Sequence, residues 1–590
     1  MRRQIKIAAS VAVSSVLVLL LACGNIGQIP ILVSERGPDF LISKCDPGMA
    51  TNLLRVSLLH PPLTLNPVIA TDPVSSLVSN QFTSTLYRYN PIEDTFEPGL
   101  ATGVDRDQDS KVFTIHLRRF ITFSDGTPFT AEDVLMTINY LQNADIKTPI
   151  RAYLDFAGGR LAFKQLDAET IQCVSKEELS LIEPILCRIP VLPKSAIEAA
   201  AGRNRLQNLY GLDTPAGELV SIGPYVLKSF SREEKKIILE RNPNYWVLDA
   251  AGQRLPYTNE VVFDFAGTST DLSMRFRTGE SDLIDFLDPQ DAERLENVRG
   301  LKIVNTGPSC ATYVSWFNLN TKSDPDTREG VVPGYRLSWF NELKFRQAVS
   351  QLYDRNAILA DVFKGKGVAG SGILSPLEKE WVPELASDGF SPANARQLLT
   401  EGRFTMNAAV TPNALYGPNK NPVQFAITVL TGDSIGERLA MQIERTLISI
   451  GIKATMVSLP YDLFYPKIYS TYDYDMAVMR LETPANAVFH RELSYFSSPG
   501  RIWHPDAAVP TAEAEKEMAE SLDTFYSSPD WNKRYEAARK VERALSQNKL
   551  LVPIVKPDGI FAAKGKIANV NVNHRCATIM WNLEELYQVE

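Results

Sequence analysis

The chain has 590 residues, 44% of them hydrophobic and 22% charged, which is the composition of a globular protein with a sizeable core. Its 69 acidic and 61 basic residues give a formal net charge of −8. An acidic chain argues against nucleic acid as a partner because phosphate binding needs a basic surface, and the length predicts several domains.

The first 23 residues predict an exported, lipid-anchored protein. A basic start with Arg2, Arg3 and Lys6 precedes a nearly unbroken apolar run at 7–21. About 15 apolar residues suit an export signal, whereas a membrane span takes roughly 20. The run ends in Leu-Leu-Ala-Cys23, which resembles the bacterial lipobox and implies cleavage before a cysteine that carries lipid (palmitate). A plain signal peptide or a tail-less anchor is the alternative.

Regular structure is expected only beyond a tether at 23–47, which is rich in Gly and Pro. The first expected strand covers 53–58. Apolar residues alternate with more polar ones at 112–118, which predicts a half-buried strand. After a turn, Thr130 stands three residues before Asp133, the spacing of a capping box that begins a helix.

The second half of the chain predicts a mixed α/β fold. A strand at 425–430, a helix capped by Asp433 and a strand at 452–459 form a βαβ unit, which implies a locally parallel sheet. Apolar residues at helical spacing predict one helix over 343–363 and two more, near 512–526 and 531–547.

The cysteines suggest disulfides and give no metal site. In an oxidising compartment, Cys173 and Cys187 are expected to pair because they are close in sequence, and Cys310 and Cys576 because their segments are expected to meet. Cys45 is left over. The five histidines never approach metal-ligand spacing, so we expect no metal and no other cofactor.

No sequence motif indicates an enzyme. Residues 365–370 match G-x-G-x-x-G, but they follow a predicted helix, whereas a dinucleotide site needs a preceding strand. We therefore expect a protein that binds without catalysing a reaction.

A longer stretch carries a family resemblance. Residues 117–134 (Leu-Arg-Arg-Phe-Ile-Thr-Phe-Ser-Asp-Gly-Thr-Pro-Phe-Thr-Ala-Glu-Asp-Val) resemble the signature of the family 5 extracellular solute-binding proteins, the peptide- and nickel-binding receptors of ABC importers. Other marks of this family occur in the proper order: Leu65-Asn-Pro67, Glu97-Pro-Gly-Leu-Ala101, Ile222-Gly-Pro-Tyr225, Arg241-Asn-Pro-Asn-Tyr-Trp246, Phe317-Asn-Leu319, Phe345-Arg-Gln-Ala348 and Asp354-Arg355.

The resemblance implies a two-lobed α/β fold of the periplasmic-binding-protein type (type II, cluster C) with an extra inserted domain. After the signal peptide (1–22) and the tether, the first lobe would combine a discontinuous domain (48–90, 194–317 and 562–590) with the inserted domain (91–193). The second lobe would be 318–561. Chain crossings near residues 317 and 562 would form the hinge.

The resemblance also suggests ligand-binding residues. Peptide-binding members hold the ligand backbone as an added strand, and the matching stretch here is Thr71-Asp72-Pro73. Tyr153 falls near the position of cleft tyrosines. Ordinary loop residues are the alternative interpretation of both.

One segment departs from the peptide-binding pattern. Oligopeptide binders carry a Trp-x-x-Asp-Tyr type segment whose aspartate pairs with the α-ammonium of the peptide, and the stretch after Asp475 lacks it. Glu482 could supply a carboxylate instead, whereas Arg480 would suit an anionic group of a ligand.

These features predict a monomeric receptor outside the cell, anchored by its lipid at the periplasmic face or the cell surface. It would capture a peptide or similar small solute between its lobes and deliver it to ABC-transporter permease subunits. The alternative is a lipid-anchored scaffold or sensor that keeps the fold but acts through a protein partner, suggested by the altered Arg480–Pro484 segment.

Overall fold

The computed structural model describes residues 38–156, 158–323, 330–385, 387–407, 414–482, 491–495, 498–505 and 512–589. The predicted export signal and Cys23 lie outside the described residues, as does the tether up to residue 37.

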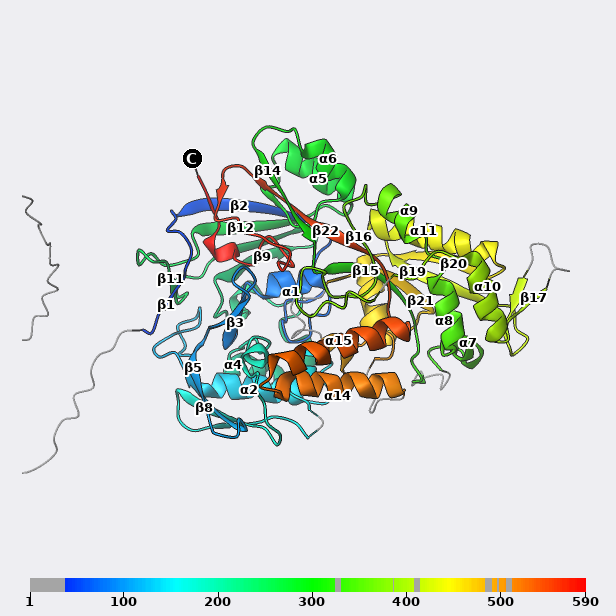
Figure 1. Ribbon diagram of the computed structural model, residues 1–590. Helices are drawn as coiled ribbons and strands as arrows, with labels where there is room; N and C mark the ends of the chain where they lie inside the picture. The colour runs from blue at the N-terminus through cyan, green and yellow to red at the C-terminus, as the bar shows by residue number, and fades with distance from the viewer. Residues whose placement is uncertain are drawn as a thin grey trace, which may run out of the picture. The chain divides into compact units, whose positions relative to one another are not determined.

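Twelve strands of the described residues form one continuous sheet (Figure 1). Ten of them follow one another in the order β20 (Lys453–Leu459), β19 (Gln424–Leu430), β21 (Met476–Glu482), β15 (Ala311–Phe317), β22 (Val552–Lys564), β13 (Leu283–Ile284), β2 (Thr51–Leu58), β12 (Thr258–Phe265), β10 (Lys236–Arg241) and β9 (Tyr225–Ser231). Two more, β14 (Leu301–Pro308) and β16 (Gly367–Ala369), pair with β22.

The long strand β22 divides this sheet into two halves. Its residues 552–557 pair with β15 and β16, whereas residues 558–564 pair with β14 and β13. The chain also passes from one half to the other between β14 and β15. Strand pairing therefore places the two crossings near 308–311 and 557–558, earlier in the chain than the expected positions near 317 and 562.

The hydrophobic core is divided in the same way. One cluster of buried residues surrounds β2 and β12 and includes Val56 and Phe263. Another surrounds β15, β19 and β21 and includes Trp316 and Leu439. We call the two halves the first and the second lobe, and they agree with the expected two-lobed α/β class. A small third cluster lies under α5 (Ser269–Thr278) and α6 (Pro289–Leu295).

The inserted domain of the first lobe contains a four-stranded sheet covered by a helix. The strands follow the order β5 (Ala101–Arg106), β6 (Val112–Leu117), β8 (Thr170–Val174) and β7 (Ala162–Gln165). The predicted strand at 112–118 is thus confirmed. Helix α2 (Ala131–Gln142) begins at the predicted capping box, where Thr130 and Asp133 exchange hydrogen bonds with each other's backbone.

The predicted βαβ unit of the second lobe is confirmed. Strands β19 and β20 are parallel, and α11 (Ser434–Ser449) connects them. Asp433 caps this helix by accepting a hydrogen bond from Gly436 N, and the helix buries Ile435, Leu439, Ile443 and Leu447.

Two expectations were wrong in detail. The single helix expected over 343–363 is two helices, α8 (Leu343–Ser350) and α9 (Arg355–Asp361), because the Asp354 carboxylate caps a new helix at Ala357 N. Residues 41–42, expected in the tether, form strand β1 (Leu41–Ile42), which pairs with β11 (Val247–Leu248).

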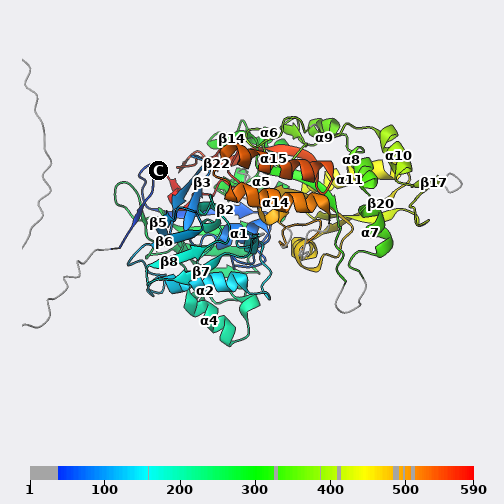
Figure 2. The ribbon, with the colours of Figure 1, turned by 60° about the horizontal axis from the view of Figure 1, so that its bottom comes forward.

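The C-terminal helices α14 (Glu513–Ser527) and α15 (Trp531–Gln547) form a hairpin, and both views show them side by side (Figures 1 and 2). The sequence of this hairpin falls in the expected second lobe. Its residues Phe525 and Tyr526, however, belong to the hydrophobic core of the first lobe. Ser180 N of the inserted domain donates to Tyr526 O at 2.9 Å. The hairpin therefore touches both lobes.

The other elements are short. The helices are α1 (Pro73–Ser79), α3 (Glu183–Leu186), α4 (Lys194–Gly202), α7 (Gly334–Phe340), α10 (Pro392–Glu401), α12 (Tyr461–Pro466) and α13 (Arg491–Ser494). The strand pairs are β3 (Tyr87–Asn90) with β4 (Thr95–Pro98), β17 (Thr405–Asn407) with β18 (Ala414–Tyr416), and β23 (Ile567–Ala568) with β24 (Tyr587–Gln588).

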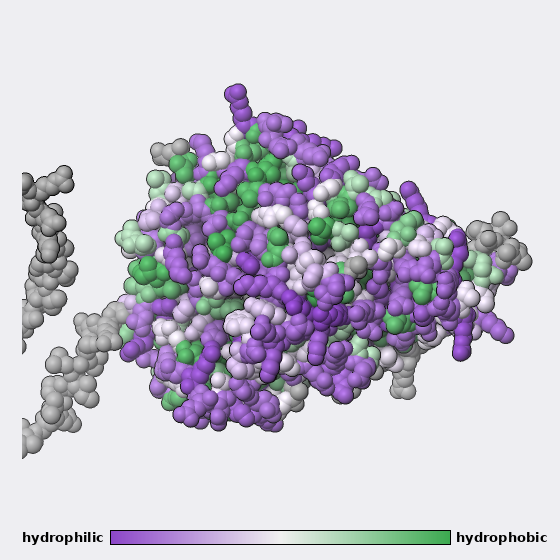
Figure 3. Space-filling model, in the orientation of Figure 1, coloured by the Kyte–Doolittle hydropathy of each residue, from purple (hydrophilic) through white to green (hydrophobic). Residues whose placement is uncertain are grey.

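On the face in Figure 3, hydrophobic residues gather mainly around β2 and β14, whereas hydrophilic residues cover the α14–α15 hairpin. Among the described residues, no helix combines the length and the apolar character needed to cross a membrane.

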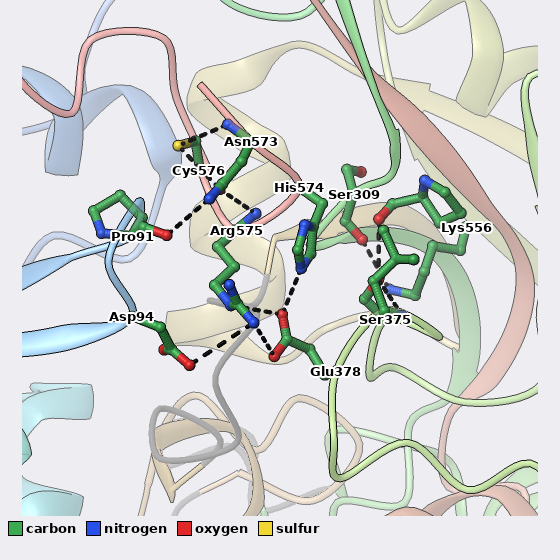
Figure 4. A network of polar contacts seen from close by, with 12 residues as sticks. Pro91, Asp94, Ser309, Ser375, Glu378, Lys556, Asn573, His574, Arg575 and Cys576 are labelled. Atoms are coloured by element: carbon green, nitrogen blue, oxygen red, sulfur yellow. Dashed lines mark hydrogen bonds and ion pairs between the residues drawn. The ribbon is translucent and has the colours of Figure 1, made fainter. Parts of the chain in front are cut away.

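The expected disulfides, Cys173 with Cys187 and Cys310 with Cys576, are not formed among the described residues. Cys173 points into the core beneath β8, opposite Phe113 and Phe163, whereas Cys187 ends α3 beside the cleft described below. Cys576 Sγ donates to Asn573 Oδ1 (Figure 4), and Cys310 is buried. Burial raises the pKa of both Cys310, to about 12, and Cys576, to about 11.

Candidate ligand-binding cleft

A cavity of about 720 Å³ lies between the two lobes, within the range of small-molecule sites. The first lobe contributes residues around 57–89 and 285–288, and the inserted domain adds Ile150 and Arg188. The second lobe contributes residues around 430–435, 461–469 and 479–482. A solute in this cavity would touch both lobes at once.

The expected stretch Thr71-Asp72-Pro73 lines the cleft. It is the beginning of α1 rather than an edge strand, with Pro73 in the first helical turn. The Asp72 carboxylate caps the helix by accepting from Ser75 N at 2.8 Å, and burial raises the pKa of this carboxyl. The Asp72 carbonyl accepts from Ser76 N at 3.1 Å, so α1 already uses the backbone of this stretch from Asp72 onward.

Arg480 and Glu482 also line the cleft, as expected. They are alternate residues of β21 and therefore lie on the same face of the sheet. Their side chains form an ion pair with each other, and the Arg480 guanidinium stacks on Phe286 of the first lobe at 3.6 Å from the ring centre. Each group that was expected to receive a charged ligand already has a partner of opposite charge.

Tyr153 does not line the cleft, contrary to expectation. It is fully buried at the end of a short 3-10 helix (Pro149–Tyr153). The Arg188 guanidinium lies over its ring at 5.5 Å, and it is Arg188 that reaches the cavity. Tyr153 therefore supports the wall from behind.

Three tyrosines form an aromatic wall on the second lobe. Tyr461 and Tyr465 belong to α12, and Tyr469 lies in the π-helical turn (Lys467–Thr471) that follows. Their spacing of four residues places them on one face. Neighbouring ring centres are 4.6 and 6.1 Å apart, and all three rings line the cleft.

Direct bonds join the lobes across the cleft. Tyr461 Oη donates to Asp72 Oδ1 at 2.5 Å. Asp288 of the first lobe accepts from Ser434 Oγ at 3.0 Å and pairs with Arg438 at 3.3 Å. Arg188 of the inserted domain pairs with Glu492 at 2.7 Å. The structure therefore shows the cleft in a shut form.

His60 adds a stacking contact with Tyr461 to these bonds between the lobes. Its ring stacks on Tyr461 with centroids 4.6 Å apart, and burial lowers its pKa to about 4, so it is neutral at pH 7. Nearby, Gly432 has a φ of +88° and faces Gly267 O, so a Cβ there would be both strained and 2.8 Å from that oxygen. The lobes approach too closely at this point for a larger residue.

Asp285 is an acid of the cleft wall with a raised pKa. It accepts a hydrogen bond from Ile579 N at 2.6 Å. Burial, and next the negative charge of Glu482, raise its pKa to about 7. It is therefore partly protonated near neutral pH.

A buried lysine joins the two chain crossings: Lys556 Nζ donates to Ser309 O at 3.4 Å (Figure 4). The Lys556 ammonium, on β22, also donates to Thr312 Oγ1 at 2.6 Å and to Ile373 O at 2.8 Å. Burial lowers its pKa to about 8. Nearby, Glu378 accepts from His574 (2.8 Å) and from Arg575 (3.2 Å), which links the C-terminal segment to the second lobe.

The sequence did not predict several residues that line the cleft: His60, Asp285, Asp288, Asp433, Tyr461, Tyr465 and Tyr469. The tyrosines had a readable signal, since their spacing repeats every four residues. The acids had none, because each looks like an ordinary loop or capping residue. Among the described residues, no cluster of His, Cys, Asp and Glu could hold a metal ion.

The chain is similar to known binding proteins. It is 23% identical over 415 residues to a probable ABC transporter-binding protein of Deinococcus radiodurans, an alignment that covers 68% of this chain and 67% of that protein. Its fold matches the oligopeptide-binding protein AppA of Bacillus subtilis in complex with a nonapeptide (TM-score 0.77, 17% identity, 92% of this chain and 100% of that chain). It also matches the periplasmic binding protein MelB of Agrobacterium fabrum in complex with stachyose (TM-score 0.79, 20% identity, 92% and 85%).

These likenesses agree with the two-lobed fold described above. The model of the bacterial extracellular solute-binding proteins, family 5, matches residues 95–490, which is more than half of the chain. The chain therefore belongs to the family 5 bacterial extracellular solute-binding proteins.

Proposed function

We propose that this protein is a lipid-anchored receptor that captures a peptide or a similar small solute between its lobes and delivers it to an ABC-transporter permease. The observation that carries the proposal is the cavity of about 720 Å³ lined by both lobes. A solute that touches both lobes only in the shut form shifts the population toward that form. The protein then acts by binding and closure, without catalysis.

The bonds across the cleft support this mechanism. Asp72 with Tyr461, Asp288 with Arg438 and Arg188 with Glu492 each join the two sides. They form only when the lobes approach, and they would stabilise the shut form that docks on the permease. We place the hinge at the crossings near 308–311 and 557–558, where few strands connect the lobes.

The export signal supports the location. The apolar run at 7–21 followed by Cys23 is typical of a lipid-anchored exported protein. Within the first lobe we assign Thr71, Asp72 and Pro73 to ligand contact, and Arg480 and Glu482 within the second. The alternative of a scaffold with a blocked cleft is less well supported, because the described cleft retains an open cavity.

Small-angle scattering tests the closure. The full chain, purified in detergent, is measured with and without the solutes of a tryptic digest of casein and of a plant oligosaccharide extract. We expect at least one mixture to reduce the radius of gyration. A radius unchanged by both mixtures contradicts capture by closure.

Cell fractionation tests the anchor. The parent protein is expected in the membrane fraction and the Cys23→Ser variant in the soluble or unprocessed fraction, with Cys45→Ser as the matched control. Uptake assays with a gene-deletion strain then test delivery to the permease, because loss of the receptor should abolish uptake of the captured solute.

A further inference from the structure

The charges on the described wall of the cleft are matched within the protein. Three ion pairs, Arg88 with Glu584 (2.6 Å), Arg188 with Glu492 (2.7 Å) and Arg480 with Glu482, account for every arginine that lines it. Asp288 pairs with Arg438. No lysine lines the described part of the cleft. An anionic group of a ligand would therefore have to displace a carboxylate from an arginine.

Three lining carboxylates have no basic partner, but each has an internal role. Asp72 caps α1 and accepts from Tyr461. Asp433 caps α11 at Gly436 N and accepts from Tyr313 Oη at 3.1 Å. Asp285 accepts from Ile579 N, and burial raises the pKa of all three. A ligand ammonium would have to compete with these bonds.

Neutral polar groups of the wall are also available, although Arg480, paired through its other nitrogens, has no described acceptor at Nε. Among the described residues, nothing hydrogen-bonds His60 Nε2, although its side chain is buried in the cleft wall. No described residue donates to or accepts from the hydroxyls of Tyr465 and Tyr469, which line the cavity.

The aromatic wall suits a particular shape of ligand. The rings of Tyr465 and Tyr469 are nearly parallel, with 7° between their planes and 6.1 Å between their centres. Phe286 and Trp581 add further rings to the lining. The C–H face of a sugar ring packs on such rings. Sugar hydroxyls both donate to and accept from phenols and imidazole, and they donate to carboxylates.

We propose that the ligand of this cleft is an uncharged, hydroxyl-rich solute of the short-oligosaccharide class, held by the tyrosine wall, rather than a peptide with charged ends. This inference rests on the proposed function of solute capture. It differs from the peptide expectation in the charge of the ligand, which can be measured directly.

The first test identifies what the protein carries. The full chain is purified in detergent from cells grown with yeast extract, and the solutes released by heat are analysed by mass spectrometry and electrophoresis. Neutral carbohydrate in near-stoichiometric amount supports the inference. Released peptides leave the proposed function intact and overturn the inference.

The second test compares matched ligands by calorimetry. The probes are cellotetraose and stachyose, cellotetraonic acid (one added carboxylate), deacetylated chitotetraose (added ammonium groups) and zwitterionic tetra-alanine. We expect a neutral probe to bind at least tenfold more tightly than any charged one, with no dependence on salt. Tighter binding of a charged probe, or no binding of either neutral probe together with no released carbohydrate, overturns the inference.

Variants then connect the binding to the wall. Tyr465→Phe and Tyr469→Phe each remove one hydroxyl and keep the ring, so each should weaken binding of the neutral solute roughly 3- to 10-fold. Tyr535→Phe, on α15 and outside the cleft lining, is the control. Unchanged affinity in both cleft variants would contradict the proposal that the tyrosine wall holds the ligand. If no solute of either class binds and deletion of the gene leaves uptake intact, the proposed function fails as well.

Discussion

Tyr461 and Asp72 lie on opposite lobes, and the Tyr461 hydroxyl donates a hydrogen bond of 2.5 Å to the same carboxylate oxygen of Asp72 that caps α1. The bond joins the beginning of one helix to the beginning of another across the cleft. It can form only when the lobes are shut, which makes it a direct measure of closure.

Removal of this bond should weaken the shut form. Tyr461→Phe keeps the ring that stacks on His60 and leaves Asp72 bonded to Ser75. A hydrogen bond to a charged group contributes about 1.5 kcal/mol or more, so we expect roughly tenfold weaker ligand binding. Calorimetry gives the affinity and scattering gives the radius with ligand.

The matched control is Tyr535→Phe, which removes a hydroxyl outside the cleft. The thermal midpoint of Tyr461→Phe should change little, because the bond joins the lobes and supports the core of neither. An affinity equal to that of the parent would show that this bond does not contribute to closure.

His60 should make the shut form sensitive to acid. Burial lowers its pKa from 6.5 to about 4, so an open or unfolded state binds the proton more strongly between these values. The stability contributed by neutral His60 is complete above pH 6.5 and is lost as the pH falls toward 4. At pH 5 this loss amounts to about 2 kcal/mol.

The variant His60→Phe keeps a ring against Tyr461 and cannot titrate. Between pH 7 and pH 5, its unfolding free energy should fall by less than that of the parent, as measured by urea denaturation at each pH. His116→Gln, at a half-buried position of β6 where the ring bonds Asp105, serves as the control. Parallel curves for parent and His60→Phe would be inconsistent with a buried neutral histidine.

Asp285 should have the opposite dependence on pH. Its pKa is raised to about 7, so the folded state holds the proton more strongly than the unfolded chain. Stability is therefore lost as the pH rises from about 4 to about 7. Asp285→Asn retains an oxygen that can accept from Ile579 N and removes the charge.

We expect Asp285→Asn to exceed the parent in unfolding free energy at pH 8, by a margin that shrinks as the pH is lowered toward 4. Urea denaturation over this pH range measures the difference in unfolding free energy between the variant and the parent. Asp282→Asn is unsuitable as a control because Asp282 pairs with Arg55 and Lys564. Asp167→Asn, in an exposed turn, is the better comparison. A margin independent of pH would contradict the raised pKa.

Local patterns explain which parts of the fold could be predicted. The alternation around Ile115, the capping box of Thr130 and the helix after Asp433 each depend on neighbours within a few residues, and the structure confirms them. The break between α8 and α9 was missed because the apolar spacing continues across it. At this break, the Asp354 carboxylate caps the first turn of α9, so a new helix begins although the apolar spacing predicts a continuous one.

The sequence predicted several residues that line the cleft, but not the contacts that their side chains make. Arg480 was expected to receive a charged group, yet Glu482, two residues along the same strand, already pairs with it. Its other partner, Phe286, lies on the first lobe and becomes visible only when the lobes are assembled. The burial of Tyr153 behind Arg188 likewise depends on contacts between distant segments. Long-range packing decides which polar groups remain available to a ligand, and spacing along the chain does not record it.

Arg491 should be essential for holding the second lobe against the inserted domain. Its fully buried guanidinium donates to Ala152 O at 2.5 Å and to Asp523 Oδ1 at 2.8 Å, and it stacks on Phe156 at 4.0 Å from the ring centre. Truncation to alanine leaves the Asp523 carboxylate without this cation and opens a void. Loss of one partner of a buried ion pair costs about 3–5 kcal/mol.

We therefore expect Arg491→Ala to lose about 3–5 kcal/mol in urea denaturation, whereas Arg396→Ala, at an exposed position of α10, should be neutral. Arg491→Lys should recover little, because a lysine cannot reproduce the planar fork that reaches a carbonyl and a carboxylate at once. If Arg491→Ala does not accumulate, Asp523→Asn gives a milder test of the same pair. Full stability of Arg491→Ala would mean that the inserted domain and the second lobe are held together by their apolar contacts alone.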